Sequence, residues 1–166
     1  MKKTILTSTV FLLFSSLLSF GQTDSSTANL GDEMTKMLTA KIFMDVDTNL
    51  YKTRQGNFYI SEKPQAMIMA ILFSQSLEKA KAKLSDDAKN KNVIIKESGE
   101  LESNGKKIAF KKGEMKQNGE NMLVEFYAVE ATKESTIFIT GVYLPKDKQR
   151  FANSAKKAAL TAKLEQ

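Results

Sequence analysis

Two Asn-Gly pairs constrain the fold of this chain more than any other feature. Asn104-Gly105 and Asn118-Gly119 each separate segments in which apolar and polar residues alternate. Asn and Gly both accept the positive φ of a type I′ turn, which joins neighbouring antiparallel strands. Two such turns in succession predict an antiparallel meander. Its four predicted strands cover residues 93–102, 106–117, 120–130 and 135–144, with the polar turn "ATKES" before the last.

An apolar run upstream of the meander fits either a strand or a helix. The run "QAMIMAILF", residues 65–73, directly follows Pro64 and is apolar on both alternating faces. Such a run is typical of a central strand covered on both sides. The next segment, 76–90, carries Leu and Ala on one helical stripe and so forms an amphipathic helix in its own right. We therefore favour a strand for 65–73.

The remaining segments complete an α+β pattern. Helical spacing of apolar residues predicts a short helix over 31–39 and a terminal helix over about 147–164, whose alanine stripe allows close packing on a sheet. Alternation predicts strands over 41–47 and 56–60, with Gly56 turning the chain into the second. The order predicts an α+β fold with a mainly antiparallel sheet flanked by helices, an α/β/α sandwich.

The N-terminus has the layout of an export signal. Lys2 and Lys3 precede an uncharged apolar stretch, 5–20, and Gly21 supplies a small residue for cleavage. A retained N-terminal anchor is the alternative, although the stretch is shorter than a usual membrane span. We assign 1–21 to a signal peptide, 22–29 to a flexible tether and 30–166 to a single α+β domain.

The compartment and the charge follow from this assignment. We expect an exported protein, periplasmic or extracellular, with no integral membrane span after cleavage. The chain has no Cys, so neither a lipid-modified Cys nor a disulfide contributes, and packing must stabilise the domain. Removing Lys2 and Lys3 lowers the formal net charge from +6 to +4. That modest excess favours solubility and does not indicate a nucleic-acid partner.

The most charge-dense stretch, 103–120, lies within the predicted meander. A nucleic-acid groove needs basic side chains on one face together with stacking aromatic residues. Strand alternation instead divides five lysines between two faces, so we predict solvated sheet lysines, with an anion-binding patch as the alternative. Lys107 and Lys111 lie on one predicted face, and Lys106, Lys112 and Lys116 lie on the other.

A possible cation site occurs at "DVDTN", residues 45–49. Asp45, Asp47 and Asn49 match the first three ligand positions of an EF-hand loop. The same loop needs Gly at its sixth position and Glu at its twelfth, where this chain has Leu50 and Gly56. An EF-hand is therefore excluded. A non-standard calcium site stays open, and exposed residues at a strand end are the preferred interpretation.

The composition excludes most catalytic and cofactor chemistry. With no His and no Cys, the chain cannot build a Ser-His-Asp or Cys-His arrangement or a zinc site with nitrogen and sulfur ligands. The sequence contains no phosphate-binding or dinucleotide-binding glycine motif. We assign no catalytic, cofactor-binding or metal-binding residue, and we expect a protein that is not an enzyme and takes no cofactor.

Two leucines at the C-terminus are the candidate partner contact. Leu160 and Leu164 fall roughly opposite the Phe151 face of the predicted terminal helix. One interpretation is that the last turn frays or folds under a neighbouring loop, as chain ends often do. The other is that Leu160 and Leu164 form a small exposed apolar strip that meets a partner protein or a membrane surface.

Several segments together resemble a known superfamily. They are "MIMAILF", "SLEKAKAKL", "SNGKKIAFKKGE", "TIFITGVYLP" and "FANSAKKAAL". Their order resembles the PsbP-like α/β/α sandwich, whose members include the photosystem II protein PsbP, a Ran-binding nuclear import factor and small exported bacterial proteins. The resemblance implies an antiparallel sheet flanked by helices and function by docking onto larger assemblies. It implies no catalytic motif.

Three functional hypotheses follow. The leading one is a non-enzymatic exported accessory protein that binds another envelope protein through a sheet face or the terminal helix. The second is a carrier for a small apolar or anionic ligand held between sheet and helix. The third is a hydrolase that uses carboxylates. Two close carboxylates in a cleft would favour the third, and a dry apolar pocket would favour the second.

Overall fold

The computed structural model describes residues 35, 37, 39–90 and 92–165. The chain divides into two units, Met1–Gly31 and Asp32–Gln166, and the described residues belong to the second. The predicted signal peptide and tether lie outside the described residues. So does most of the predicted helix 31–39, of which Thr35, Met37 and Thr39 are described and helical. None of the described helices is long and apolar enough to cross a membrane.

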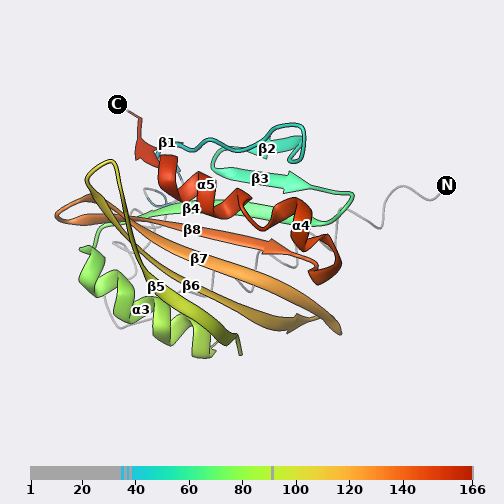
Figure 1. Ribbon diagram of the computed structural model, residues 1–166. Helices are drawn as coiled ribbons and strands as arrows, with labels where there is room; N and C mark the ends of the chain where they lie inside the picture. Colours follow the sequence, from blue (N-terminus) through green and yellow to red (C-terminus); the bar gives the residue numbers. More distant parts are fainter. Residues whose placement is uncertain (1–34, 36, 38, 91, 166) are drawn as a thin grey trace. The chain divides into compact units, whose positions relative to one another are not determined.

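A seven-stranded antiparallel sheet forms the centre of this unit (Figure 1). Its spatial order is β2-β3-β4-β8-β7-β6-β5, and each neighbouring pair is antiparallel. The predicted α+β class with a mainly antiparallel sheet is confirmed. The strands are β2 (Thr53–Gln55), β3 (Phe58–Ser61), β4 (Ala66–Phe73), β5 (Ile94–Ser103), β6 (Lys106–Gln117), β7 (Glu120–Thr132) and β8 (Ser135–Tyr143).

The Asn-Gly turns form as the sequence predicts. Asn104 and Gly105 have φ values of 54° and 71°, and Asn118 and Gly119 have values of 51° and 84°. These left-handed conformations are the ones that a type I′ turn requires. Consequently β5, β6 and β7 follow one another as hairpins, and β8 returns along β7. The meander prediction is confirmed.

The ambiguous run is a central strand. β4 pairs with β3 on one side and with β8 on the other, and seven of its eight residues are buried. Burial on both faces explains why its sequence is apolar at every position rather than alternating. The following helix, α3 (Leu77–Asn90), turns Leu77, Ala80, Leu84 and Ala88 toward the sheet, where it lies chiefly over β7.

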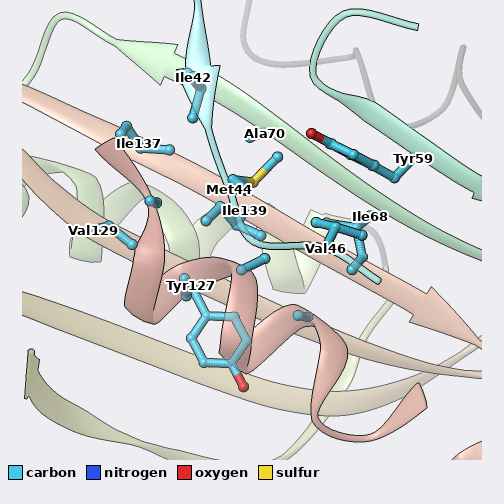
Figure 2. Close-up of a cluster of buried hydrophobic side chains, with 14 of the residues drawn as sticks. Ile42, Met44, Val46, Tyr59, Ile68, Ala70, Tyr127, Val129, Ile137 and Ile139 are labelled. Atoms are coloured by element: carbon cyan, nitrogen blue, oxygen red, sulfur yellow. The ribbon is translucent and has the colours of Figure 1, made fainter. Parts of the chain in front are cut away.

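The opposite face of the sheet is covered by C-terminal helices and by the segment that precedes β2. The helices are η1 (Pro145–Asp147), α4 (Lys148–Phe151) and α5 (Ser154–Thr161). Figure 2 shows Ile42, Met44 and Val46 packed together with side chains of the sheet. Gly141 of β8 permits close packing, because a Cβ there would lie 2.5 Å from the Cβ of Ala155. Sheet residues in this core include Ile68, Ala70, Tyr127, Val129, Ile137 and Ile139.

The predicted terminal helix 147–164 is wrong in its continuity and its end. It breaks between α4 and α5, and Ala162 is already extended, with φ −60° and ψ 131°. The chain then forms β9 (Lys163–Leu164), which pairs with β1 (Ile42–Phe43). Backbone pairing with a distant segment therefore overrides the helical periodicity. The same pairing limits the predicted strand 41–47 to two residues, and the short strand β2 was not predicted.

Candidate functional site

A solvent-open pocket of about 460 Å³ lies between the segment 45–50 and α5. Leu50 and Leu160 supply its apolar surface. The pocket brings together Asp45, Asp47 and Leu160, three residues that the sequence singled out for different reasons. Around the leucines, polar and charged side chains complete the lining: Asp45, Asp47, Asn153, Ser154, Lys156 and Lys157.

Direct contacts fasten the two walls of the pocket to each other. The backbone N–H of Asp45 donates to Oγ1 of Thr161 at 2.9 Å, and the Asp45 carboxylate pairs with Nζ of Lys157 at 3.0 Å. Thr161 in turn donates to the carbonyl oxygen of Lys157 at 2.9 Å. The extended segment after β1 is thereby held along α5.

The two aspartates of the possible cation site are engaged within the chain. Asp45 pairs with Lys157, and Asp47 Oδ1 accepts a hydrogen bond from the N–H of Asn49 at 2.8 Å. The carbonyl oxygen of Asp47 also accepts from Leu50 and Tyr51, which makes a tight turn. In the part of the chain that the structure describes, no three acidic side chains converge as a metal site would require. The aspartates thus shape the pocket wall.

A buried carboxylate lies beneath the helical layer and was not anticipated. Glu125 of β7 is only 4% exposed. The hydroxyl of Tyr127 donates to Oε2 of Glu125 at 2.7 Å, and the hydroxyl of Tyr143 donates to Oε1 at 2.6 Å. Both carboxylate oxygens are therefore hydrogen-bonded, as a buried charge requires. The sequence contained one signal for this cluster, since alternation places Glu125 on the same core face as Tyr127 and Val129.

Tyr51 connects this cluster to the pocket. Its side chain is hydrogen-bonded to that of Ser154, which lines the pocket, and its ring packs edge-on against Phe151 at 5.5 Å between centroids. The ring of Phe151 also contacts Tyr143, with centroids 6.2 Å apart. Phe151 is completely buried, so it anchors α4 onto the tyrosine cluster.

The environment holds the three tyrosines in their protonated form. The pKa of Tyr51 is raised to about 12: burial is the main cause, the hydrogen bond with Ser154 opposes the shift, and the charge of Glu125 adds to it. Burial, together with the charge of Glu125, also raises the pKa of Tyr127 and of Tyr143 far above the usual range. At neutral pH the hydroxyls are thus hydrogen-bond donors, and the cluster acts as a satisfied polar part of the core.

The two leucines predicted as a partner contact are both half-buried, but they occupy different surroundings. Leu160 lines the pocket, and its carbonyl oxygen accepts a hydrogen bond from Ser103 at 3.4 Å. Leu164 lies in β9 opposite Ile42 and packs against the core. Leu160 therefore lies on α5 and Leu164 on β9, so the two do not share one helical face. The pocket presents Leu160 with Leu50 instead.

The outer surface of the helical layer is strongly basic. Residues 145–165 contain six exposed basic side chains and only two acidic ones, Asp147 and Glu165. Near the end of this segment, Nζ of Lys163 lies 5.1 Å from the ring centroid of Phe43, which is 42% exposed. We call the six side chains the basic layer; they are Lys146, Lys148, Arg150, Lys156, Lys157 and Lys163.

The lysines of β6 are used differently. Lys106 donates to the carbonyl oxygen of Ala162 at 3.2 Å. Lys112 pairs with Glu97 at 3.6 Å and lies over the ring of Phe110. Lys107 and Lys116 are exposed. The strand therefore gathers no single basic surface.

Comparison with known proteins gives a fold and no closer relationship. No protein-family model and no curated protein matches the sequence. Among solved structures, the chain is similar to LpqN, a protein involved in cell envelope biogenesis of Mycobacterium tuberculosis, with a TM-score of 0.60 and 12% identity over 75% of this chain and 83% of LpqN. It is also similar to PA94, a protein of unknown function from Pseudomonas aeruginosa, with a TM-score of 0.53 and 10% identity over 74% and 81% of the two chains.

Proposed function

We propose that this protein is a non-enzymatic, exported accessory protein that binds another protein of the cell envelope through the pocket beside α5. The observation that carries the proposal is the pocket itself, in which Leu50 and Leu160 are surrounded by charged and polar side chains. An apolar centre inside a polar rim is the usual anatomy of a protein interface. The contacts of Asp45 with α5 preform this surface, which lowers the entropic cost of binding.

Three further observations support the proposal. The N-terminal pattern of Lys2, Lys3 and an apolar stretch is typical of exported proteins. LpqN, which shares the fold, is involved in cell envelope biogenesis in its own organism. The order of the predicted segments resembles that of the PsbP-like superfamily, and membership of it, with docking onto larger assemblies, is part of the proposal. Fold alone does not determine function, so the pocket remains the main argument.

The carrier hypothesis is the second candidate. A volume of about 460 Å³ falls within the range of small-molecule pockets. Lys156 in the lining offers a partner for an anionic group, and the two leucines offer contacts for an apolar one. This candidate places the ligand between α5 and the 45–50 segment rather than between sheet and helix.

Native mass spectrometry of the protein purified from its own envelope fraction tests both candidates. We expect a complex with a second protein for the wild type, and loss of that complex for Leu160→Asp. As a second variant, Asn153→Trp places a bulky side chain at the pocket rim without removing a core contact. Ile94→Asp is the matched control, because Ile94 is 62% exposed on β5 outside the pocket.

The outcomes separate the hypotheses. A reproducible extra mass of the size of a small molecule, lost on denaturation, would establish the carrier and overturn the proposed function. If Asn153→Trp and Ile94→Asp both retain the protein complex, the pocket is not the docking site.

A further inference from the structure

We propose that the partner presents an acidic segment to the basic layer. An apolar side chain of this segment enters the pocket, and the carboxylates on either side of it contact the lysines of the layer. This inference rests on the proposed function and specifies the chemistry of the partner. It follows from three observations, which are the availability of the charges, their imbalance and the position of Lys156 and Lys157 in the lining of the pocket.

The charges of the layer are available. Lys146, Lys148, Arg150 and Lys156 are exposed. The ion pairs formed between described residues include none of these four side chains. Lys157 does pair with Asp45, but this pair is exposed and so is worth little to stability. A partner can therefore engage the basic layer without first breaking strong internal contacts.

Most charges of the layer are unpaired among the described residues, in contrast to those around β5 and β6. Around β5 and β6, lysines and glutamates alternate between neighbouring strands and pair with one another. Lys81 contacts Glu100 at 2.7 Å, and Lys112 contacts Glu97 at 3.6 Å. The basic layer has one acidic residue beside α4, Asp147, which is half-buried. Such a one-sign surface attracts the opposite charge and accelerates encounter with it.

The shape favours a protein segment over a lipid surface. The pocket is concave, and Lys156 and Lys157 lie in its lining together with Leu50 and Leu160. A flat layer of headgroups cannot fill a concavity, whereas a projecting apolar side chain can. Asp45 and Asp47 also lie in the wall and repel any anion, so the apolar side chain, and not a carboxylate, occupies the pocket. An apolar residue flanked by carboxylates satisfies all of these features.

Fluorescence anisotropy with a labelled synthetic peptide tests the inference on the full exported chain. The probe is a short peptide with a central Leu flanked by Glu residues, and its matched control has Gln in place of every Glu. We expect the Glu peptide to bind at least about tenfold more tightly than the Gln peptide, and its affinity to fall by about tenfold between roughly 50 mM and 500 mM salt. Failure of the Glu peptide to bind, or equal binding of both, would overturn the inference.

Charge-reversal variants locate the effect. Lys148→Glu/Lys156→Glu changes two exposed side chains of the basic layer and should abolish peptide binding. Lys79→Glu/Lys107→Glu changes the net charge by the same amount on the α3 side of the sheet and should leave binding within about twofold, because charges there are screened from the layer. All four side chains are exposed, so both variants should fold. Equal loss in the two variants would mean that net charge, and not the layer, binds the peptide.

A vesicle arm and the natural complex complete the test. Tighter binding to phosphatidylglycerol vesicles than to the Glu peptide, abolished by Lys148→Glu/Lys156→Glu, would assign the layer to a membrane and overturn the inference. If the natural complex survives Lys148→Glu/Lys156→Glu but is lost in Asn153→Trp, the inference fails while the proposed docking site stands. If Asn153→Trp also retains the complex, the proposed docking site fails.

Discussion

β6 and the C-terminal helical layer are both rich in basic residues, with five lysines on the strand and six basic side chains in the layer. On β6, alternation sends successive lysines to opposite faces, and two of them, Lys106 and Lys112, find partners within the chain. In the layer, short helices and a turn place the basic side chains on the outside, while Phe151 and the alanines of α5 face the sheet.

The comparison shows that the placement of charge matters more than its density. The stretch that is most conspicuous in the sequence disperses its charge, and the less conspicuous C-terminal segment concentrates it. The decisive difference is that a strand distributes neighbouring residues between two faces, whereas an amphipathic helix packed on a sheet has one outer face. Variants that alter the packing of the helical layer on the sheet test how far the basic layer depends on that packing.

The largest expected effect comes from Phe151→Ala. Phe151 is fully buried between Tyr51 and Tyr143, and its truncation should lower the free energy of unfolding by about 3–5 kcal/mol. Phe43→Ala is the control, since Phe43 is 42% exposed and should cost less than about 1 kcal/mol. Urea unfolding measures both. Similar losses in the two variants would contradict the anchoring role of Phe151.

Alkaline pH should loosen the layer through the tyrosine cluster. The pKa of Tyr51 is about 12 in the folded protein and about 10 when unfolded, so its contribution is fully present below pH 10 and disappears as pH rises toward 12. A shift of this size corresponds to roughly 2–3 kcal/mol. Unfolding free energies measured across this range should fall, and Tyr51→Phe should make the slope shallower without abolishing it, because Tyr127 and Tyr143 also contribute. An unchanged slope in Tyr51→Phe would rule out this coupling.

Gly141→Ala should displace α5 from the sheet. Its Cβ would lie 2.5 Å from that of Ala155, and relieving the overlap should cost about 1–3 kcal/mol. Gly113→Ala on β6 is matched, because its Cβ would lie 2.5 Å from the carbonyl oxygen of Ile94. Both variants should lower the melting temperature, but Gly141→Ala alone should weaken binding of the Glu peptide. Equal binding of the Glu peptide by the two variants would show that binding does not depend on how closely α5 packs on the sheet.

The smallest effect is expected for Lys81→Ala. Lys81 contacts Glu78 at 2.8 Å and Glu100 at 2.7 Å, but both glutamates are largely exposed. Solvent screening limits such pairs, so the loss should stay below about 1 kcal/mol, with no change in binding of the Glu peptide. Chemical denaturation and anisotropy measure the two quantities. Stronger peptide binding in this variant would be unexpected, because it would implicate the α3 side of the molecule.

Local patterns allowed much of the fold to be predicted. The Asn-Gly turns, the two-sided run of β4 and the stripe of α3 are encoded within single segments, and each forms as expected. β9 could not be predicted in this way, because Leu164 pairs with Ile42, which is distant in the sequence.

The site was only partly visible in the sequence. Asp45, Asp47 and Leu160 were singled out, but nothing local indicated that they share one pocket. Helical spacing puts Leu164 on the same face as Leu160, but α5 ends at Thr161, so Leu164 does not belong to the helix. Glu125 was missed because a single acidic residue in a strand shows nothing of the tyrosines that surround it.

Site-specific photo-cross-linking in growing cells tests the central claim most directly. A photoreactive amino acid would replace Lys156 in one strain and Lys107 in another, and adducts would be compared after irradiation. The account predicts one discrete protein adduct from position 156 and none from position 107. An adduct from position 107 with none from position 156 would contradict it.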